Sequence, residues 1–182
     1  IIQKQVERGV RFDEAKAALL YAKLAGEREK LKTELQTLFK PWYKAKKTFI
    51  PKQDSRVAGY VKDAPVTPIE LIEFNPSSND HITNRLMEVH GWEPTKFTPT
   101  GKPAIDTEVL KELEYPEAKT LSTYHSLDKA IGMLAEGNQA WLKCVKNGRI
   151  HGSIKTNGTV TGRMSHFNPN LGQVTKKDEG FG

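Results

Sequence analysis

Residues 151–173 read HGSIKTNGTVTGRMSHFNPNLGQ, and this stretch carries the most specific motif of the chain. The residues at 149–154 and 159–161 are of the types that favour β-structure, so they predict two short strands. The pair Asn157-Gly158 lies between them, and Asn-Gly favours the left-handed backbone of a tight hairpin turn. We therefore expect a β-hairpin, followed by a bend at 169–171.

Three hydrogen-bond donors lie on this predicted hairpin and the bend after it. Arg163, Asn170 and Gln173 suit the purine N3 and pyrimidine O2 acceptors of a DNA minor groove, whose pattern is similar for all base pairs. Such donors would hold a correctly paired duplex without reading its sequence. The alternative is a polar network of β-turns that binds nothing.

Residues 14–39 predict a long amphipathic helix. Asp13 suits its N-cap, and Pro41 prevents its continuation. Leucines recur at about 3.5-residue spacing, with charged residues on the other face, which is typical of antiparallel helix packing. These leucines are Leu20, Leu24, Leu31, Leu35 and Leu38.

Further helices are predicted on both sides of this segment. Residues 1–8 resemble the end of a helix that stops at Gly9, and Cys144 is expected in the core. Helices before short antiparallel strands define an α+β protein. The other predicted helices cover 79–90 (capped by Ser77 or Ser78, with Ile82, Leu86 and Val89 as its apolar stripe, ended by Gly91), 107–114 (capped by Asp106), 117–135 (kinked at Gly132) and 138–146.

Residues 40–68 predict a basic loop. Four prolines interrupt any helix, and aromatic residues alternate with lysines. This composition suits a nucleic-acid phosphate backbone or a protein partner, and the alternative is a solvated surface loop. The candidate phosphate or partner contacts are Lys44, Lys46, Lys47 and Lys52.

Composition excludes several classes of protein. The 182 residues carry a net charge of +6, which moderately favours polyanionic partners. The single cysteine excludes a disulfide framework and a cysteine-based zinc site. The same low cysteine content suits a reduced cytoplasm, which is the location we expect. No apolar stretch approaches about 18 residues, so we expect no membrane span and no membrane partner. The histidines have no metal-type spacing, and neither a phosphate-binding glycine loop nor a nucleophile elbow is present. We expect no complete active site.

Residues 151–173 also resemble the strand-and-turn motif of family A DNA polymerases, which reads TGR, a small hydroxyl residue, then PNL and an amide. The residues of this motif are most similar to those of the T-seven-like phage branch. Residues 74–82, FNPSSNDHI, resemble the thumb motif of that branch. Weaker similarities occur at residues 98–106, 135–142 and 8–13, so the resemblance covers nearly the whole chain.

The resemblance implies a partial right-hand polymerase fold. Residues 1–147 would form a thumb of long antiparallel helices, and 148–182 would begin the palm with short antiparallel strands. Arg163 matches the arginine that hydrogen-bonds the primer-terminal base pair in the minor groove. The other carried-over positions are Asn170 and Gln173, which match amides contacting template or primer, and Thr161 and Ser165, which match supporting or backbone-contacting residues.

The same resemblance implies partners and cofactors. They are primer–template DNA, a dNTP and Mg²⁺, and the metal ligands of the family have no match in this sequence. The chain would then be a piece of a longer enzyme, located in the bacterial host cytoplasm if it is phage-encoded, and would bind DNA without polymerising. In the T-seven-like branch a processivity factor binds an insertion in the thumb. The corresponding segment of this chain, residues 40–73, is much shorter. The basic loop could touch the duplex instead.

Two functions remain open at this point. The chain is either the part of a DNA polymerase that senses the primer-terminal pair, or a non-catalytic DNA-binding or partner-recruiting module, including one half of a split polymerase.

Overall fold

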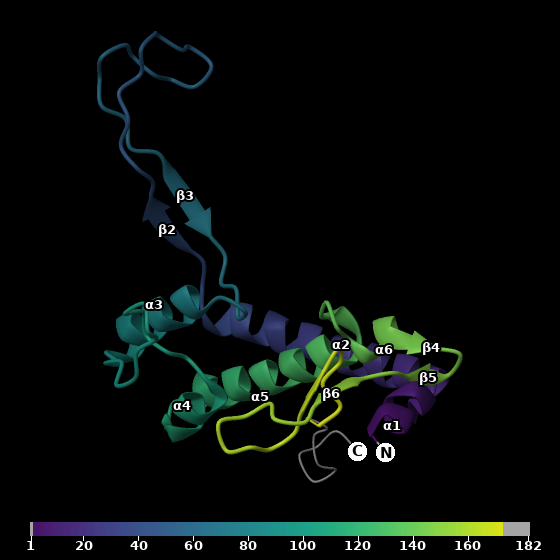
Figure 1. Cartoon of the computed structure of the whole chain (residues 1–182). Coiled ribbons are helices and arrows are strands. Elements are labelled where there is room, and N and C mark those ends of the chain that lie inside the picture. The colour runs from purple at the N-terminus through teal and green to yellow at the C-terminus, as the bar shows by residue number, and fades with distance from the viewer. Residues whose placement is uncertain (1, 173–182) are drawn as a thin grey trace. The chain divides into compact units, whose positions relative to one another are not determined.

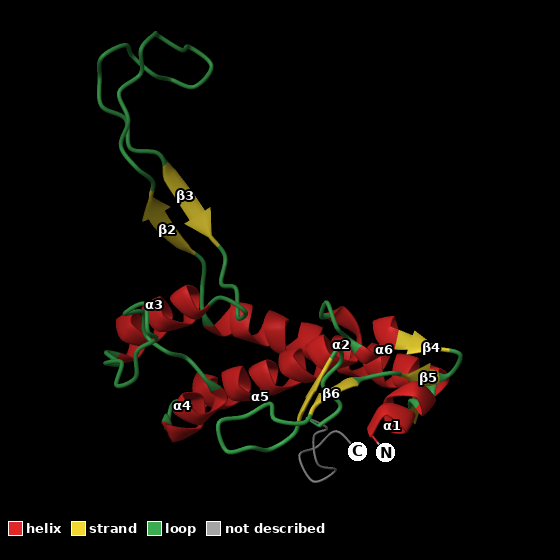
Figure 2. Ribbon diagram, viewed as in Figure 1, coloured by secondary structure: helices red, strands yellow, loops and turns green. Residues whose placement is uncertain are grey.

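The protein is described by a computed structural model that covers residues 2–172 (Figure 1). Helices and small antiparallel sheets are both present, which confirms the predicted α+β class (Figure 2). By contacts the chain divides into two compact units. Unit 1 contains the described residues of 1–31 and 122–182, and unit 2 contains residues 32–121.

Most elements belong to one unit, and the two longest helices contribute to both. The shared helices are α2 (Glu14–Leu38) and α5 (Pro116–Ile131). Unit 1 also contains α1 (Ile2–Arg8), β1 (Val10–Arg11), the π-helical turn η1 (Gly132–Glu136), α6 (Trp141–Cys144), β4 (Val145–Lys146), β5 (Arg149–Ile150), β6 (Ser153–Lys155) and β7 (Ser165–Phe167). Unit 2 also contains β2 (Trp42–Ala45), β3 (Ile69–Ile72), α3 (Asn79–His90) and α4 (Thr107–Glu112).

Helices α2 and α5 run antiparallel, as the leucine spacing predicted. Tyr21 of α2 contacts Glu136 beyond the end of α5, whereas Glu34 near the end of α2 contacts Thr120 near the start of α5. One cluster of buried residues in unit 1 consists of Ala17, Leu24, Leu127, Ile131 and Leu134. Leu38 is the exception to the predicted stripe, since it is exposed. None of the described helices is long and apolar enough to cross a membrane.

A network of ionic hydrogen bonds fixes α2 to the turn η1. The Arg28 guanidinium donates to both carboxylate oxygens of Glu136, at 2.7 and 2.8 Å, and to Asp128 at 2.9 Å. These bonds lower the pKa of Glu136, because the guanidinium stabilises the ionised carboxylate. Helix α5 therefore ends in a π-helical turn that α2 holds in place, where the sequence predicted a kink at Gly132.

The predicted helix over 138–146 ends earlier than expected. Helix α6 stops at Cys144, which is half-buried and not in the core, and β4 follows. Strands β4 and β5 are joined by Asn147 and Gly148, both with positive φ (50° and 69°). Two left-handed residues make the tight hairpin turn that Asn-Gly favours. This turn was not predicted from the sequence, because β4 lies inside the predicted helix.

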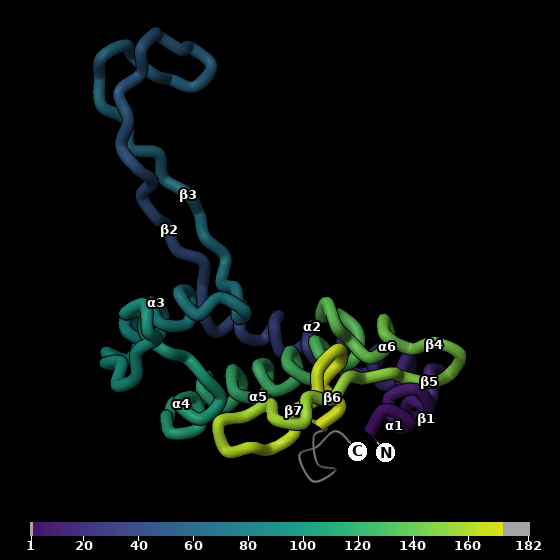
Figure 3. Tube along the Cα trace, viewed as in Figure 1, coloured from purple at the N-terminus to yellow at the C-terminus, as the bar shows by residue number. Residues whose placement is uncertain are grey.

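The predicted strand at 159–161 is wrong. Strand β6 pairs antiparallel with β7, with Ser153 opposite Phe167 and Lys155 opposite Ser165 (Figure 3). Residues 156–164 form the loop between these strands, and Asn157-Gly158 lies in that loop and does not make a two-residue turn. The β-hairpin therefore exists, with a longer loop and a second strand further along the chain.

The predicted loop at 40–68 is also wrong in part. Strands β2 and β3 pair antiparallel, with Trp42 opposite Ile72 and Ala45 opposite Ile69. The pairing continues outward through the bridges Phe49–Val66 and Ser55–Tyr60. Figure 1 shows these segments as an arm that extends away from α3. We call residues 40–73 the arm. These strands are exposed at nearly every position, so they lack the alternation of buried and exposed residues by which a strand is predicted from sequence.

The base of the arm packs on α3. Trp42 meets His81 edge-on, with ring centroids 5.1 Å apart, and the Arg85 guanidinium lies 4.2 Å from the centre of the Trp42 ring. Helix α3 begins at the Ser78 cap and ends at Gly91, as predicted. Ile82 and Leu86 are fully buried, but Val89 is 55% exposed, so it does not belong to the apolar stripe.

Replacing Arg28 with alanine should lower the free energy of unfolding by about 1–2 kcal/mol, because two carboxylates lose their charged donor. The folded-state pKa of Glu136 lies below the ordinary 4.5, so its contribution is complete above pH 4.5 and disappears as the pH falls through the lowered value. Chemical denaturation over a series of pH values from neutral to strongly acidic measures both effects. Lys30→Ala, an exposed change on the same helix, is the control. A loss for Arg28→Ala that stays constant over the whole series would contradict the role of the ion pair.

Candidate nucleic-acid interface

The loop between β6 and β7 holds the backbone of Arg163 through the Thr159 side chain. The Arg163 backbone N–H donates to Thr159 Oγ1 at 2.9 Å, and Thr159 Oγ1 lies 3.3 Å from the Arg163 carbonyl oxygen, to which it donates. The same carbonyl accepts the Gly158 N–H at 3.1 Å. The Arg163 side chain is exposed. The loop therefore presents a guanidinium to solvent from a fixed backbone position.

The loop closes only because residue 158 has no side chain. A Cβ atom at Gly158 would overlap the Ser165 hydroxyl and lie 2.6 Å from Ser165 Cβ. Ser165 is half-buried at the start of β7, so it has little room to move. Thr161 is exposed, and its hydroxyl lies 3.1 Å from that of Thr159. The two predicted supporting residues thus differ, since Ser165 packs against the loop whereas Thr161 lies at its surface.

The bend after β7 carries the predicted amide. Asn170 is half-buried, and its Oδ1 accepts the Gly172 backbone N–H at 2.9 Å. Pro169 before it is fully buried, and the Asn168-Pro169 peptide bond is cis. Gln173, the third predicted donor, lies outside the described residues. Arg163 and Asn170 therefore belong to one hairpin and the bend that follows it, as predicted.

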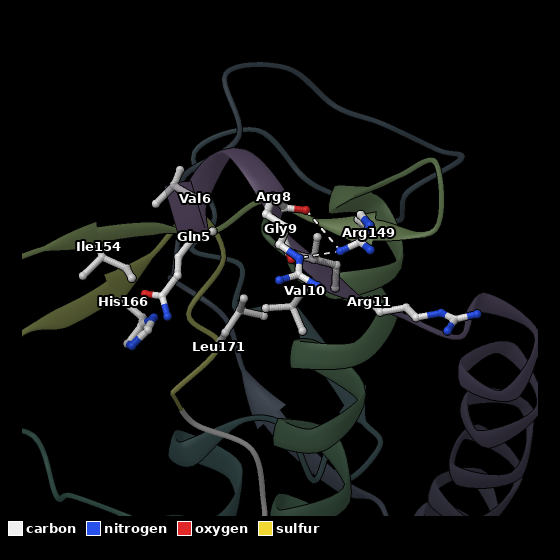
Figure 4. Close-up of a pocket in the computed structure, with 12 residues that line it drawn as sticks. Gln5, Val6, Arg8, Gly9, Val10, Arg11, Arg149, Ile154, His166 and Leu171 are labelled. Atoms are coloured by element: carbon white, nitrogen blue, oxygen red, sulfur yellow. Dashed lines mark hydrogen bonds between the residues drawn. The ribbon is translucent and has the colours of Figure 1, made fainter. Parts of the chain in front are cut away.

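A cavity of about 540 Å³ lies beside this hairpin in unit 1 (Figure 4). Its lining comes from α1, β1, β5, β6, β7 and the bend. Apolar side chains such as Val10, Ile154 and Leu171 line it, and arginines lie at its edge. Arg149 donates to the carbonyls of Arg8 and Gly9, both at 3.2 Å, so it ties β5 to the end of α1. The cavity therefore lies between the β6–β7 hairpin and the sheet of β1, β5 and β4.

The predicted phosphate contacts lie elsewhere, on the arm in unit 2. Lys44, Lys46, Lys47 and Lys52 are all exposed. Lys46 forms an ion pair with Glu70 across the two strands, at 2.9 Å, whereas Lys44 lines a hollow beside Trp42 and Asn84. These lysines belong to unit 2, whereas the hairpin that carries Arg163 belongs to unit 1.

Several residues of this interface were not predicted from the sequence. Thr159 was assigned to a strand, although its hydroxyl organises the loop. Gln139 donates to Asn168 Oδ1 at 2.5 Å, a contact between residues 29 positions apart. No local pattern indicates such a contact. For Thr159 the available signal was its place directly after Asn157-Gly158, which is compatible with a longer loop.

Comparison with known proteins identifies the family of this chain. The sequence model for DNA polymerase family A matches residues 50–181, which is more than half of the chain. This chain belongs to DNA polymerase family A. Two relatives, each named DNA-directed DNA polymerase, come from Enterobacteria phage T3 and Escherichia phage T7. Each is 36% identical over 219 residues, an alignment that covers 96% of this chain and 31% of the relative.

A bacterial relative is more distant. DNA polymerase I of Chloroflexus aurantiacus is 34% identical over 106 residues, covering 56% of this chain and 11% of that protein. The chain thus spans about a third of the length of its phage relatives of family A. The phage alignments are longer than the 182 residues of this chain, so those relatives carry residues that have no counterpart here.

Family A polymerases use divalent metal ions, so a metal site was tested against the side chains present. Among residues 2–172, no group of three or more His, Cys, Asp or Glu side chains is placed to hold a metal ion. The described residues therefore do not fit the metal that the family implies. They include exposed cations, Arg163 among them, and the half-buried amide of Asn170.

Gly158→Ala should destabilise the β6–β7 hairpin, because the added methyl group overlaps Ser165. We expect an increase in amide hydrogen exchange across residues 153–167 and a loss of about 1–3 kcal/mol in unfolding free energy. Gly26→Ala is a matched control, since nothing lies within 4 Å of a Cβ there and alanine favours its helix. Unchanged exchange in Gly158→Ala would show that the hairpin does not depend on this close approach.

Proposed function

We propose that this chain is the part of a DNA-directed DNA polymerase that holds primer–template duplex and senses the primer-terminal base pair. Membership of family A and the names of the phage relatives support this proposal. The whole enzyme's activity, its DNA and its dNTP substrates are included in the proposal, because the chain spans only part of those relatives. Residues 1–147 would act as the thumb, and residues 148–182 would begin the palm.

The observation that carries the proposal is the presentation of Arg163. Thr159 and Gly158 occupy its backbone N–H and carbonyl, so the loop is preorganised and the guanidinium is exposed. A guanidinium offers several N–H donors, and the minor-groove edge of each base pair offers N3 or O2 acceptors. Arg163 can therefore bind any correctly paired primer terminus at a defined position.

Asn170 is proposed to act from the bend beside it. Because its Oδ1 accepts the Gly172 N–H, its amide NH₂ is directed to a different acceptor. That group would donate to a base or sugar near the primer end. Gln173 is proposed for the same role. Ser165 would support the loop, and Thr161 would contact the DNA backbone.

In this proposal, the contribution of the chain to catalysis is alignment. Holding the primer 3′ end in a fixed orientation lowers the entropic part of the barrier for attack on an incoming nucleotide. Mg²⁺ is proposed for the intact enzyme only, with ligands outside residues 2–172. The chain alone is expected to bind primed DNA without extending it.

The arm supports a second contact. Its lysines would neutralise phosphates of the duplex, which is the use that best fits Lys44, Lys46, Lys47 and Lys52.

A partner-recruiting module is the competing function. It is favoured by the exposed apolar face of the arm, where Tyr43, Ile69 and Leu71 are 76%, 69% and 53% exposed. A processivity factor would be a partner of this kind.

Arg163→Ala should raise the Kd of the 182-residue chain for primer–template duplex by about fivefold to 100-fold, the equivalent of about 1–3 kcal/mol. The increase should be smaller when the primer terminus is mispaired, because the wild-type contact is then already weakened. Fluorescence anisotropy with labelled duplex measures both values. Arg11→Ala removes the same charge from another exposed position of unit 1. Equal losses of affinity in the two variants would show that Arg163 contributes only a non-specific positive charge.

Replacing Lys44, Lys46 and Lys47 together with alanine should flatten the dependence of log affinity on log salt by about 0.9 for each phosphate that a lysine no longer neutralises. A control variant with alanine at Lys4, Lys23 and Lys30 has the same net charge and should keep a steeper slope. If the slopes of the two variants are equal, the arm does not bind phosphates and recruitment of a protein partner is the better account.

A further inference from the structure

The connection between η1 and α6 touches the bend that carries Asn170. Gln139 lies in this connection, and its Nε2 donates to Asn168 Oδ1 at 2.5 Å. Both residues belong to unit 1, and they are 29 positions apart in the chain. This is a side-chain bond from the helical part of the unit to the bend after β7.

The Asn168 backbone has a positive φ of 52°. Asparagine adopts this left-handed region more readily than most other non-glycine residues, and the bond from Gln139 holds its side chain in one orientation. The neighbour Pro169 is fully buried, which anchors the other side of the bend. Asn170 follows directly, so the direction of its side chain depends on how Asn168 and Pro169 are held.

Gln139 is itself well positioned. The Lys143 ammonium donates to the carbonyls of Glu136 and Gly137, at 2.8 and 3.0 Å, and closes the connection from the α6 side. Arg28 holds Glu136 from the α2 side through two hydrogen bonds. The residues before and after Gln139 are therefore fixed, and its amide reaches the bend from a rigid support.

We propose that Gln139 is a positioning residue for the DNA-contacting bend. Its bond to Asn168 orients the bend so that Asn170 meets the primer-terminal pair, and it links this contact to the helices of unit 1. The inference rests on the proposed function, in which Asn170 touches the duplex. It assigns to Gln139 no contact with DNA.

The test is a double-mutant cycle on the 182-residue chain, with Gln139→Ala, Asn168→Ala and the double variant. Affinity is measured for duplexes with a matched and a mispaired primer terminus. Each single variant should weaken binding to the matched duplex by about threefold to tenfold, the size expected of one hydrogen bond. The double variant should lose no more affinity than the single variant that is more affected, because both changes remove the same hydrogen bond. Binding to the mispaired duplex should change little, so the preference for a matched terminus should fall.

Asn138→Ala is the matched control, since Asn138 is an exposed amide in the same connection. It should bind like the wild type, and thermal unfolding should be similar for all variants. Additive losses, or equal losses for both duplexes, would overturn the positioning role.

Asn170→Ala separates the two proposals. If it weakens binding and Gln139→Ala does not, only the positioning role fails, whereas no effect of Asn170→Ala would reject the proposed contact and the positioning role with it.

Discussion

The contact between Gly158 and Ser165 is the constraint on which the rest of the interface depends. The two residues are so close that any side chain at position 158 would overlap the serine. This approach lets the Thr159 hydroxyl reach both backbone groups of Arg163. The backbone of Arg163 is therefore ordered before any ligand arrives, so that in the proposed DNA contact only its exposed side chain would be ordered on binding.

The bend after β7 has a comparable dependence on remote residues. Asn168 contacts Gln139, and the turn that precedes Gln139 is held by Arg28. The antiparallel packing of α2 on α5 thus supports both the core of unit 1 and the position of Asn170. This arrangement explains how a mainly helical unit can present a small β-hairpin in one orientation. The arm in unit 2 offers a different surface, with exposed lysines and an exposed apolar face.

The sequence predicted those parts of the fold that depend on local chemistry. Asp13 and Ser78 cap helices as expected, and Gly9 and Gly91 end them, because caps and stops act within one helical turn. The position of the tight hairpin turn was predicted wrongly, because the chain contains two Asn-Gly pairs. The pair at 147–148 forms the tight turn, whereas the pair at 157–158 lies in a loop that Ser165 and Thr159 shape. The strands of the arm were missed because Phe49 and Val66 pair across many intervening residues. Arg163 and Asn170 were predicted from their donor chemistry and remain proposals. Gln139 had no sequence signal, because its proposed role rests on a tertiary contact with Asn168.

The most direct test of the account uses primer–template duplexes in which one base at the primer terminus lacks a single nitrogen. Replacing the terminal purine with its 3-deaza analogue removes the minor-groove acceptor, and the 7-deaza analogue removes a major-groove acceptor as the control. We expect the wild-type chain to bind the 3-deaza duplex several-fold more weakly and the 7-deaza duplex normally, and we expect Arg163→Ala not to distinguish them. Equal binding of both duplexes by the wild-type chain, or sensitivity to the 7-deaza change alone, would contradict the minor-groove role of Arg163.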